Sequence, residues 1–355
     1  MKRRLYLFLA IFIVFALLLI VGYKFYGGSM ATKLSQNEKT ETAAIVAPIE
    51  FRFAGQSPPN HLATQTMNEI AKEIEEKTEG RVLIRVFPAN QLGNYSGVMQ
   101  NLIRGTVDMS MMSIASEFDP RLELVYVNGF LTGYDDAKRI FTPGAWLPNK
   151  LNELTEALGV HLLGSYIEGM IGIGSTKPLI EPLNPKVDKG VLVRVPNMAV
   201  YTLGAKAMGL RPITIPYSDV YQSMQTGVCD AVDGYAVAAA YTILGDVLKY
   251  WYHTNYSMEY QAILVSDKSW KKLTPSDQEV FREVSKKYTI KSIDNAQKED
   301  ERNMKLMEEK GIKVFRYTPK ELQPIKQACV TTWEALAKHG MTQELMKEFK
   351  ENLAK

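Results

Sequence analysis

Arg194 is the residue whose surroundings in the sequence point most directly to binding chemistry. It lies in the run GVLVRVP at 190–196, where alternating β-branched residues predict a strand. A charge in an apolar strand is costly unless an anion pairs with it. The planar guanidinium group can hold a carboxylate through two hydrogen bonds. From the residues alone, Arg194 predicts either a site for a bound carboxylate or an internal salt bridge.

Residues typical of catalysis or metal binding form no such pattern in this chain. The four histidines are far apart in the sequence: His61, His161, His253 and His339. None has the spacing of a transition-metal site, and the acidic residues form no calcium-binding loop. The glycine-rich run at 169–174 lacks the spacing of a phosphate-binding loop, and we interpret it as flexible backbone between strands. The sequence therefore predicts neither an enzyme nor a bound cofactor or metal.

The two cysteines, Cys229 and Cys329, allow two readings. Outside the cytoplasm they could form a disulfide, although their spacing alone does not decide this. Cys229 lies among apolar residues, which favours a buried free thiol. Neither cysteine has a histidine nearby to act as a base, so nucleophilic catalysis is not indicated.

The segments after Arg194 predict the elements that position it. Residues 201–210 predict a helix, and 212–216 a short strand. A second helix follows, with Ser218 as its N-cap and Gly227 ending it. The segment VCDAVDG at 228–234 then completes the run. Strands that alternate with helices predict an α/β fold with mainly parallel or mixed sheets.

The N-terminal half contains further elements of the same kind. The pattern predicts strands at 51–54 and 82–86 and an amphipathic helix at 61–78. Three short motifs accompany these elements: FPANQLG at 87–93, GTVD at 105–108 and SWKKLTP at 269–275.

Together these motifs resemble the substrate-binding proteins of tripartite ATP-independent periplasmic (TRAP) transporters, of the dicarboxylate-binding (DctP) type. The similarity runs in register from about residue 49 to about residue 334. It implies a two-lobed periplasmic binding protein fold with a ligand cleft, crossing segments and a long helix that spans both lobes. Residues 275–309 contain no internal Gly or Pro and would form a helix of roughly 50 Å.

The resemblance also implies the domain organisation and the function. Lobe 1 would comprise residues 49–170 and 261–297, and lobe 2 residues 171–260 and 298–355. The expected function is that of an extracytoplasmic solute-binding subunit, not an enzyme. It would capture a small organic acid by arginine–carboxylate pairing and cleft closure. It would then deliver the acid to the small and large membrane subunits of a TRAP transporter.

The resemblance places seven residues at the ligand. Arg194 would pair with the ligand carboxylate, and Tyr217 would form an aromatic wall. The remaining candidates, polar or aromatic, are Gln56, Asn94, Tyr95, Ser113 and Tyr235. Tyr201 is a weaker candidate that could simply pack.

Two departures from the family pattern bear on specificity. Ile171 stands where members commonly carry a second basic residue, and Gly234-Tyr235 stand where others carry an asparagine. With one guanidinium fewer and an aromatic ring more, the site is expected to prefer a monocarboxylate with an apolar or aromatic portion. Glu168, near Ile171, could accept a hydrogen bond from an amine or hydroxyl, or it could be a solvated turn carboxylate.

The N-terminus and the composition predict the compartment. Lys2-Arg3-Arg4 precede an apolar run at 5–23, which is typical of a signal peptide or a membrane anchor within residues 1–31. Residues 32–48 are polar and predict a flexible leader. We expect a periplasmic or extracytoplasmic protein, with cleavage or retention at the inner membrane left open.

The net charge and overall composition limit the classes of binding partner that we expect. In 355 residues the formal net charge is only +3, and no basic block occurs, so nucleic acid is not an expected partner. Two alternative functions stay open at this point: a solute-binding protein of another importer, and a membrane-tethered solute sensor.

Overall fold

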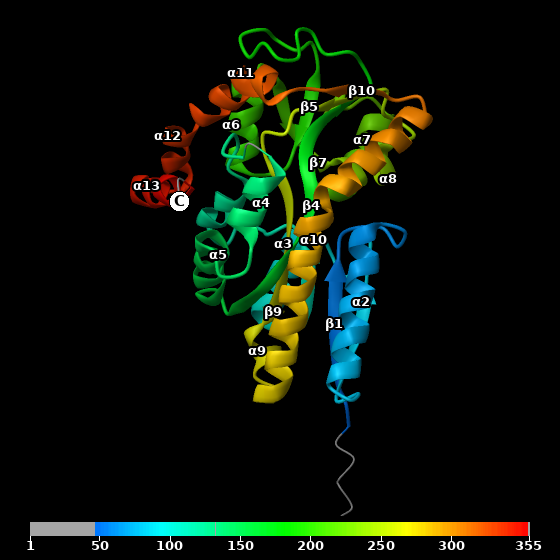
Figure 1. The fold of residues 1–355 in the computed structure, drawn as a ribbon, viewed down its shortest axis with the longest axis vertical. Coiled ribbons are helices and arrows are strands. Elements are labelled where there is room, and N and C mark those ends of the chain that lie inside the picture. Colours follow the sequence, from blue (N-terminus) through cyan, green and yellow to red (C-terminus); the bar gives the residue numbers. More distant parts are fainter. Residues whose placement is uncertain (1–46, 132, 354–355) are drawn as a thin grey trace, which may run out of the picture. The chain divides into compact units, whose positions relative to one another are not determined.

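The computed structural model describes residues 47–131 and 133–353 (Figure 1). In this part of the chain ten strands are joined in the order β2-β1-β3-β9-β4-β7-β5-β6, with β8 on β4 and β10 on β8. The strands are β1 (Ile49–Gly55), β2 (Val82–Phe87), β3 (Met109–Met112), β4 (Val160–Ser175), β5 (Leu192–Val195), β6 (Arg211–Thr214), β7 (Ala231–Ala236), β8 (Tyr250–His253), β9 (Met258–Ser266) and β10 (Lys313–Arg316). The predicted signal or anchor, and nearly all of the predicted leader, lie outside the described residues.

Strand β4 belongs to both halves of the sheet. It pairs antiparallel with β9 from Val160 to Met170, and with β7 and β8 from Ile171 to Ser175. The first half contains β1, β2, β3 and β9, and the second half contains β5, β6, β7, β8 and β10. Parallel and antiparallel pairs occur in both halves, so the prediction of a mixed α/β sheet is confirmed.

The interpretation of residues 169–174 as flexible backbone is wrong, because they form the end of β4. The glycines of this segment allow other side chains to pack directly against the backbone of β4. A Cβ atom on Gly172 would overlap the ring of Trp251, and one on Gly169 would overlap the carboxylate of Asp300. A glycine within a strand often marks a place where another group must approach the backbone closely.

The helices cover this sheet. They are α2 (Leu62–Lys77), α3 (Tyr95–Arg104), α4 (Tyr134–Phe141), α5 (Trp146–Glu156), α6 (Ala199–Ala207), α7 (Val220–Gln225), α8 (Val237–Leu244), α9 (Asp267–Trp270), α10 (Pro275–Glu309), α11 (Pro319–Val330), α12 (Trp333–Leu336) and α13 (Gln343–Leu353). Three short 3₁₀ helices are η1 (Pro120–Tyr126), η2 (Tyr217–Asp219) and η3 (Ala337–His339). In the described residues no helix has the length and apolarity needed to cross a membrane.

Helix α10 has the predicted bounds and runs along β4 in Figure 1. Its N-cap, Thr274, accepts a hydrogen bond from the backbone of Asp277, and Pro275 occupies the first turn. Side chains of α10 also bind β4 directly. The backbone N–H groups of Ser165, Ile167 and Met170 donate to Thr289, Ser292 and Asp300 at 2.8, 3.0 and 2.7 Å, respectively. The helix is therefore fixed to the strand along much of its length.

The prediction that Ser218 caps a helix is wrong. Ser218 lies inside η2, and its hydroxyl donates to the carboxylate of Asp219 instead of accepting a backbone N–H. Helix α7 begins at Val220 without a side-chain cap. Gly227 does follow the end of that helix with a φ of +75°, as predicted.

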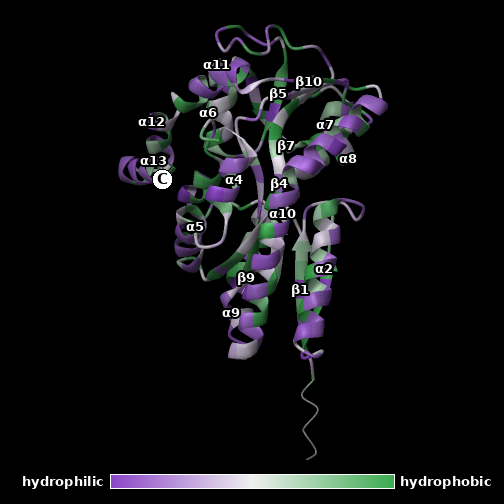
Figure 2. Ribbon diagram, viewed as in Figure 1, coloured by the Kyte–Doolittle hydropathy of each residue, from purple (hydrophilic) through white to green (hydrophobic). Residues whose placement is uncertain are grey.

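The hydrophobic core lies between the sheet and the inner faces of its helices. Figure 2 shows hydrophobic colours along the strands and mixed stripes along helices such as α2 and α10. In the first half, Phe51, Phe53 and Met67 pack with Phe281 of α10. In the second half, Trp251 is fully buried in a cluster that includes residues from the C-terminal part of α10. One helix thus contributes to the core of both halves.

Candidate functional site

Arg194 is buried at the inner end of β5, with only 1% of its surface exposed. Its Nε donates to the carbonyl of Ile215 at 2.9 Å, and its Nη1 donates to the carbonyl of Asp233 at 3.2 Å. The guanidinium carbon lies 5.6 Å from the centre of the Tyr235 ring. Within the described residues no carboxylate forms an ion pair with Arg194, so the internal salt bridge left open above is not found there. The charge is held in position by backbone carbonyls and an aromatic face.

Arg194 borders a small cavity between the two halves of the sheet. The lining residues are Tyr95, Ser113, Tyr126, Arg194, Pro196, Met198, Tyr201, Tyr217, Gly234 and Glu259. The space between their atoms is about 310 Å³, but the centre of a water-sized sphere fits in only about 20 Å³ of it. That is about the room that one water needs. An acid of several carbons would enter only if the lining residues moved apart.

The cavity lining comes from segments far apart in the chain. Tyr95 begins α3, Ser113 follows β3 and Tyr126 ends η1, all of which belong with the first half of the sheet. Residues 194–201, Tyr217 and Gly234 come from the second half. Closing the two halves on each other would therefore enclose whatever occupies the cavity.

Glu259 of β9 is the acidic residue of this lining. It is 6% exposed, and its Oε1 accepts a hydrogen bond from the Ser113 hydroxyl at 3.1 Å. Burial raises the pKa of this carboxyl well above its usual range, and the nearby charge of Glu168 adds to the rise. The Ser113 hydrogen bond and Arg194 act in the opposite direction. The sequence analysis did not single out Glu259, although an isolated carboxylate in an apolar strand is the same signal that marked Arg194.

A buried carboxylate beside the cavity fixes the start of α6. Glu123 of η1 accepts hydrogen bonds from the backbone N–H groups of Ala199 at 3.1 Å and Val200 at 3.0 Å. Asn128 donates to the carbonyl of Val200 at 3.0 Å. The N-terminus of a helix favours negative charge, whereas burial raises the pKa of Glu123. These bonds join the first half of the sheet to the helix that carries Tyr201.

Comparison with known proteins agrees with this geometry. Residues 53–339 match the family model described as bacterial extracellular solute-binding protein, family 7. The chain belongs to this family. The predicted resemblance to TRAP solute-binding proteins of the DctP type is confirmed.

Two relatives of this family 7 protein come from Vibrio cholerae. The sialic acid-binding periplasmic protein is 22% identical over 88% of this chain and 91% of its own length. The C4-dicarboxylate-binding periplasmic protein is 24% identical over 83% of this chain and 92% of its own length. Proteins of this family bind substrates for transport.

Solved structures confirm the two-lobed periplasmic binding protein fold. A TRAP periplasmic solute-binding protein from Desulfovibrio salexigens, with bound orotic acid, has a TM-score of 0.78 at 18% identity and covers 86% of this chain and 98% of its own. One from Haemophilus influenzae, with bound L-gulonate, has a TM-score of 0.76 at 22% identity and covers 86% and 99%. The predicted lobe boundaries stay a prediction, although β4 changes its pairing partners at Ile171.

The seven predicted ligand residues of this family 7 protein fall into three groups. Four of them, namely Tyr95, Ser113, Arg194 and Tyr217, line the cavity, as does Tyr201. Gln56 and Tyr235 lie behind the lining. Gln56 donates to the Ser113 hydroxyl at 3.0 Å and accepts from the Ser113 backbone at 2.9 Å. Tyr235 stacks on Tyr217, with the ring centres 5.0 Å apart. Both residues thus hold a lining residue in place.

Asn94 is not a lining residue of this cavity. Its side chain is exposed and caps α3, where Oδ1 accepts a hydrogen bond from the backbone of Gly97 at 2.9 Å. This is the ordinary role of asparagine at a helix N-cap. The position beside Tyr95 in the sequence therefore does not bring Asn94 to the cavity.

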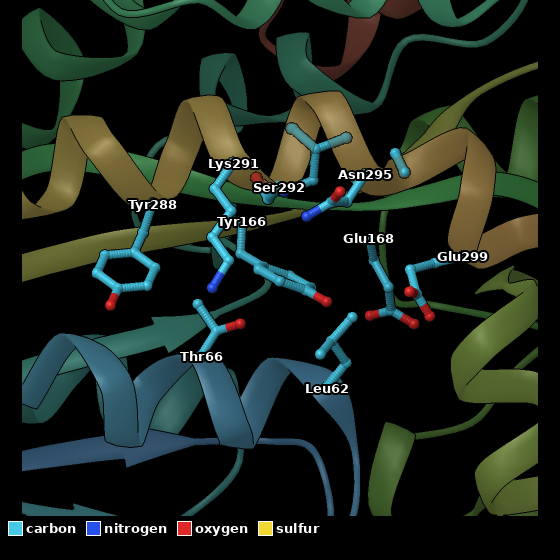
Figure 3. Close-up of a pocket in the computed structure, with 11 residues that line it drawn as sticks. Leu62, Thr66, Tyr166, Glu168, Tyr288, Lys291, Ser292, Asn295 and Glu299 are labelled. Carbon is cyan, nitrogen blue, oxygen red and sulfur yellow. Dashed lines mark hydrogen bonds between the residues drawn. The ribbon is translucent and has the colours of Figure 1, made fainter.

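A second hollow lies between α2, β4 and α10 (Figure 3). Tyr288 and Lys291 of α10 face Leu62 and Thr66 of α2 across it. Glu168 lines this hollow, but none of the seven residues placed at the ligand does. The Arg194 cavity is therefore the candidate binding site.

Glu168 belongs to the lining of this hollow and is not a solvated turn carboxylate, since it is 3% exposed within β4. Its two oxygens accept from the backbone of Ala239 and the side chain of Gln261, both at 3.0 Å. His61 lies 3.4 Å from the same carboxylate. Glu168 is therefore already held by protein groups.

Metal binding and a disulfide find no support in the described residues. No group of three or more His, Cys, Asp or Glu side chains there could hold a metal ion. Cys229 and Cys329 are both buried free thiols, as favoured above for Cys229. Burial raises the pKa of the Cys229 thiol to about 11.

Proposed function

We propose that this chain is the extracytoplasmic solute-binding subunit of a TRAP transporter that captures a small monocarboxylate. Arg194 would hold the ligand carboxylate, the tyrosines would cover its apolar part, and closure of the lobes would present it to the small and large membrane subunits. The observation that carries this proposal is a buried guanidinium that borders a cavity and has no ion-pair partner among the described residues. A bound carboxylate would supply that partner.

The preference for one carboxylate rests on the charges around the cavity. Arg194 is the cationic residue of its described lining. Ile171, at the position where a second basic residue is common in the family, is fully buried in β4 and does not line the cavity. A second carboxylate on the ligand would have no cation to meet. Orotic acid, bound by one neighbour of known structure, carries one carboxyl on an unsaturated ring, which is the kind of ligand expected here.

The test is a thermal-shift screen of the full chain against monocarboxylates, dicarboxylates and sugar acids, followed by calorimetry on each hit. A ligand at a hundredfold excess over its Kd stabilises the native state by about 2.7 kcal/mol, which is readily measured. Arg194→Ala should weaken binding by about 2–5 kcal/mol, because the ligand charge would then be buried without a partner.

Arg211→Ala is the matched control. Arg211 lies on the neighbouring strand β6, pairs in register with Leu192 and is exposed to solvent. Its removal should leave the Kd unchanged. An acid that binds Arg194→Ala as tightly as the unaltered protein would overturn the role of Arg194. A dicarboxylate that binds more tightly than every monocarboxylate would overturn the proposed specificity.

A further inference from the structure

Glu259 places a carboxyl group in the cavity that holds Arg194, and this group carries the opposite charge when it is ionised. Both residues line the cavity, and both are more than nine-tenths buried. They form no ion pair with each other, and no other described residue forms an ion pair with Glu259. A guanidinium group and a carboxyl group thus border one small space without a direct bond between them.

Only one of the two carboxylate oxygens of Glu259 accepts a hydrogen bond from a described residue. Oε1 accepts from the Ser113 hydroxyl at 3.1 Å. Ser113 is itself held by Gln56 through two hydrogen bonds, so its orientation is fixed. Among the described residues, Oε2 accepts no hydrogen bond. A carboxyl group that is 6% exposed is costly to ionise unless a ligand supplies a donor to it.

The charge balance separates the candidate ligands. A plain monocarboxylate would satisfy Arg194 but leave Glu259 buried and unpaired. A dicarboxylate would bring a second carboxylate to Glu259, which offers no N–H donor and would repel the ionised form of Glu259. A ligand with one carboxylate and one ammonium group would satisfy both residues at once. We infer that the ligand is an amine-bearing monocarboxylate, such as an amino acid, with its carboxylate on Arg194 and its ammonium group on Glu259.

This inference rests on the proposed function and names the class of substrate. It also implies a proton change. With the cavity empty, burial favours the protonated form of the Glu259 carboxyl. An ammonium group in contact favours the ionised form, so binding should release a proton from Glu259 to the buffer. The charged groups that act on the Glu259 carboxyl are Glu168 on β4 and Arg194 on β5. Glu259 in turn raises the pKa of the titratable groups around it, which are Tyr95 on α3, Tyr126 on η1, Tyr201 on α6, Tyr217 on η2 and Tyr235 on β7.

The experiment compares matched acids by calorimetry on the full chain. The three acids of a set share one carbon skeleton and differ only at one position. At that position one acid carries an amine, one a hydroxyl and one a hydrogen. Sets with two, three, four and nine carbons, and with the amine at different distances from the carboxylate, cover the range of sizes. In at least one set we expect the amine to bind at least about tenfold more tightly than both counterparts. Repeating the titration in buffers of different ionisation enthalpy should reveal the released proton.

Two variants assign the effect to Glu259. Glu259→Gln should remove the preference for the amine and the proton release while the unsubstituted acid still binds through Arg194. Glu117→Gln is the matched control, because Glu117 is an exposed carboxylate bonded to Ser96 near the cavity. It should leave both readouts unchanged. The comparison of ligands on the unaltered protein stands even if Glu259→Gln fails to fold.

The possible failures are distinct. If the hydroxy or unsubstituted acids bind as tightly as the amines in every set, the inference is overturned and the proposed function stands. If Glu259→Gln retains the full preference for the amine, the assignment to Glu259 is overturned. If no acid of any set or of the wider screen binds, the proposed function fails, and the inference fails with it.

Discussion

Replacing Glu123 with alanine would test whether the contact between η1 and α6 stabilises the closed binding site. The substitution removes the carboxylate that accepts the N–H groups of Ala199 and Val200. Helix α6 has no side-chain cap of its own, because its N-cap residue is Met198. The two N–H groups would be left without an acceptor at the edge of the cavity.

The expected magnitude follows from these bonds. A hydrogen bond to a charged group contributes about 1.5–3 kcal/mol, so two of them would contribute about 3–6 kcal/mol. Part of this is offset, since the carboxylate is buried and its pKa is raised by that burial. A net loss of about 2–3 kcal/mol in the free energy of unfolding is therefore expected. If the bonds form only when the lobes are closed, a loss of about 2 kcal/mol in the closed form raises the Kd about 30-fold.

Urea unfolding and calorimetry with a ligand from the screen measure the two effects separately. Glu123→Gln is the matched variant: it keeps one acceptor oxygen and should give an intermediate loss. An exposed carboxylate such as Glu334, exchanged for glutamine, should change neither quantity. If Glu123→Ala unfolds and binds like the unaltered protein, the reasoning is refuted. A loss of stability with an unchanged Kd would mean that these bonds do not depend on closure.

Two further predictions concern stability. Gly169→Ala should lower the free energy of unfolding by at least about 2 kcal/mol, because its Cβ would overlap Asp300. In Gly159→Ala the Cβ would meet nothing within 4 Å, so only the cost of the left-handed backbone, about 1 kcal/mol, should appear in urea unfolding. Burial lowers the pKa of His253 from 6.5 to about 4. The unfolded state therefore binds more protons at this histidine as the pH falls through 6.5, and the contribution of His253 to stability should fall by about 2 kcal/mol from pH 7.5 to pH 5. His253→Phe should lose this part of the pH dependence, and an unchanged profile would contradict the assignment.

The sequence predicted most accurately the features that depend on neighbouring residues in the chain. Helix α10 has its predicted bounds because Thr274 caps it, Pro275 suits the first turn and no breaker follows until Gly311. The strand around Arg194 was predicted because alternation of β-branched residues depends only on near neighbours. Four of the seven predicted ligand residues line one cavity, although their role in binding stays a prediction.

The features that the sequence did not predict depend on contacts between segments far apart in the chain. From the sequence, the glycines of β4 indicate a flexible link. In the structure, Trp251 and Asp300 pack against the backbone of these glycines. Gln56 bonds to Ser113, which is 57 residues away, and no local pattern indicates this contact. Its contact with a ligand stays a prediction. Glu259 is a carboxylate in an apolar strand, which is a local signal, but only the pairing of distant strands brings it to the same cavity as Arg194.

The shared strand β4 limits how members of this family can be recombined. Because β4 passes from one half of the sheet to the other, and α10 binds it from Ser165 to Met170, neither half is a contiguous piece of the gene. A chimera that exchanges one lobe must cut the chain inside a strand and a helix that the other lobe also needs. Specificity is therefore expected to have diversified by substitutions at the cavity, one position at a time, more readily than by exchange of whole lobes.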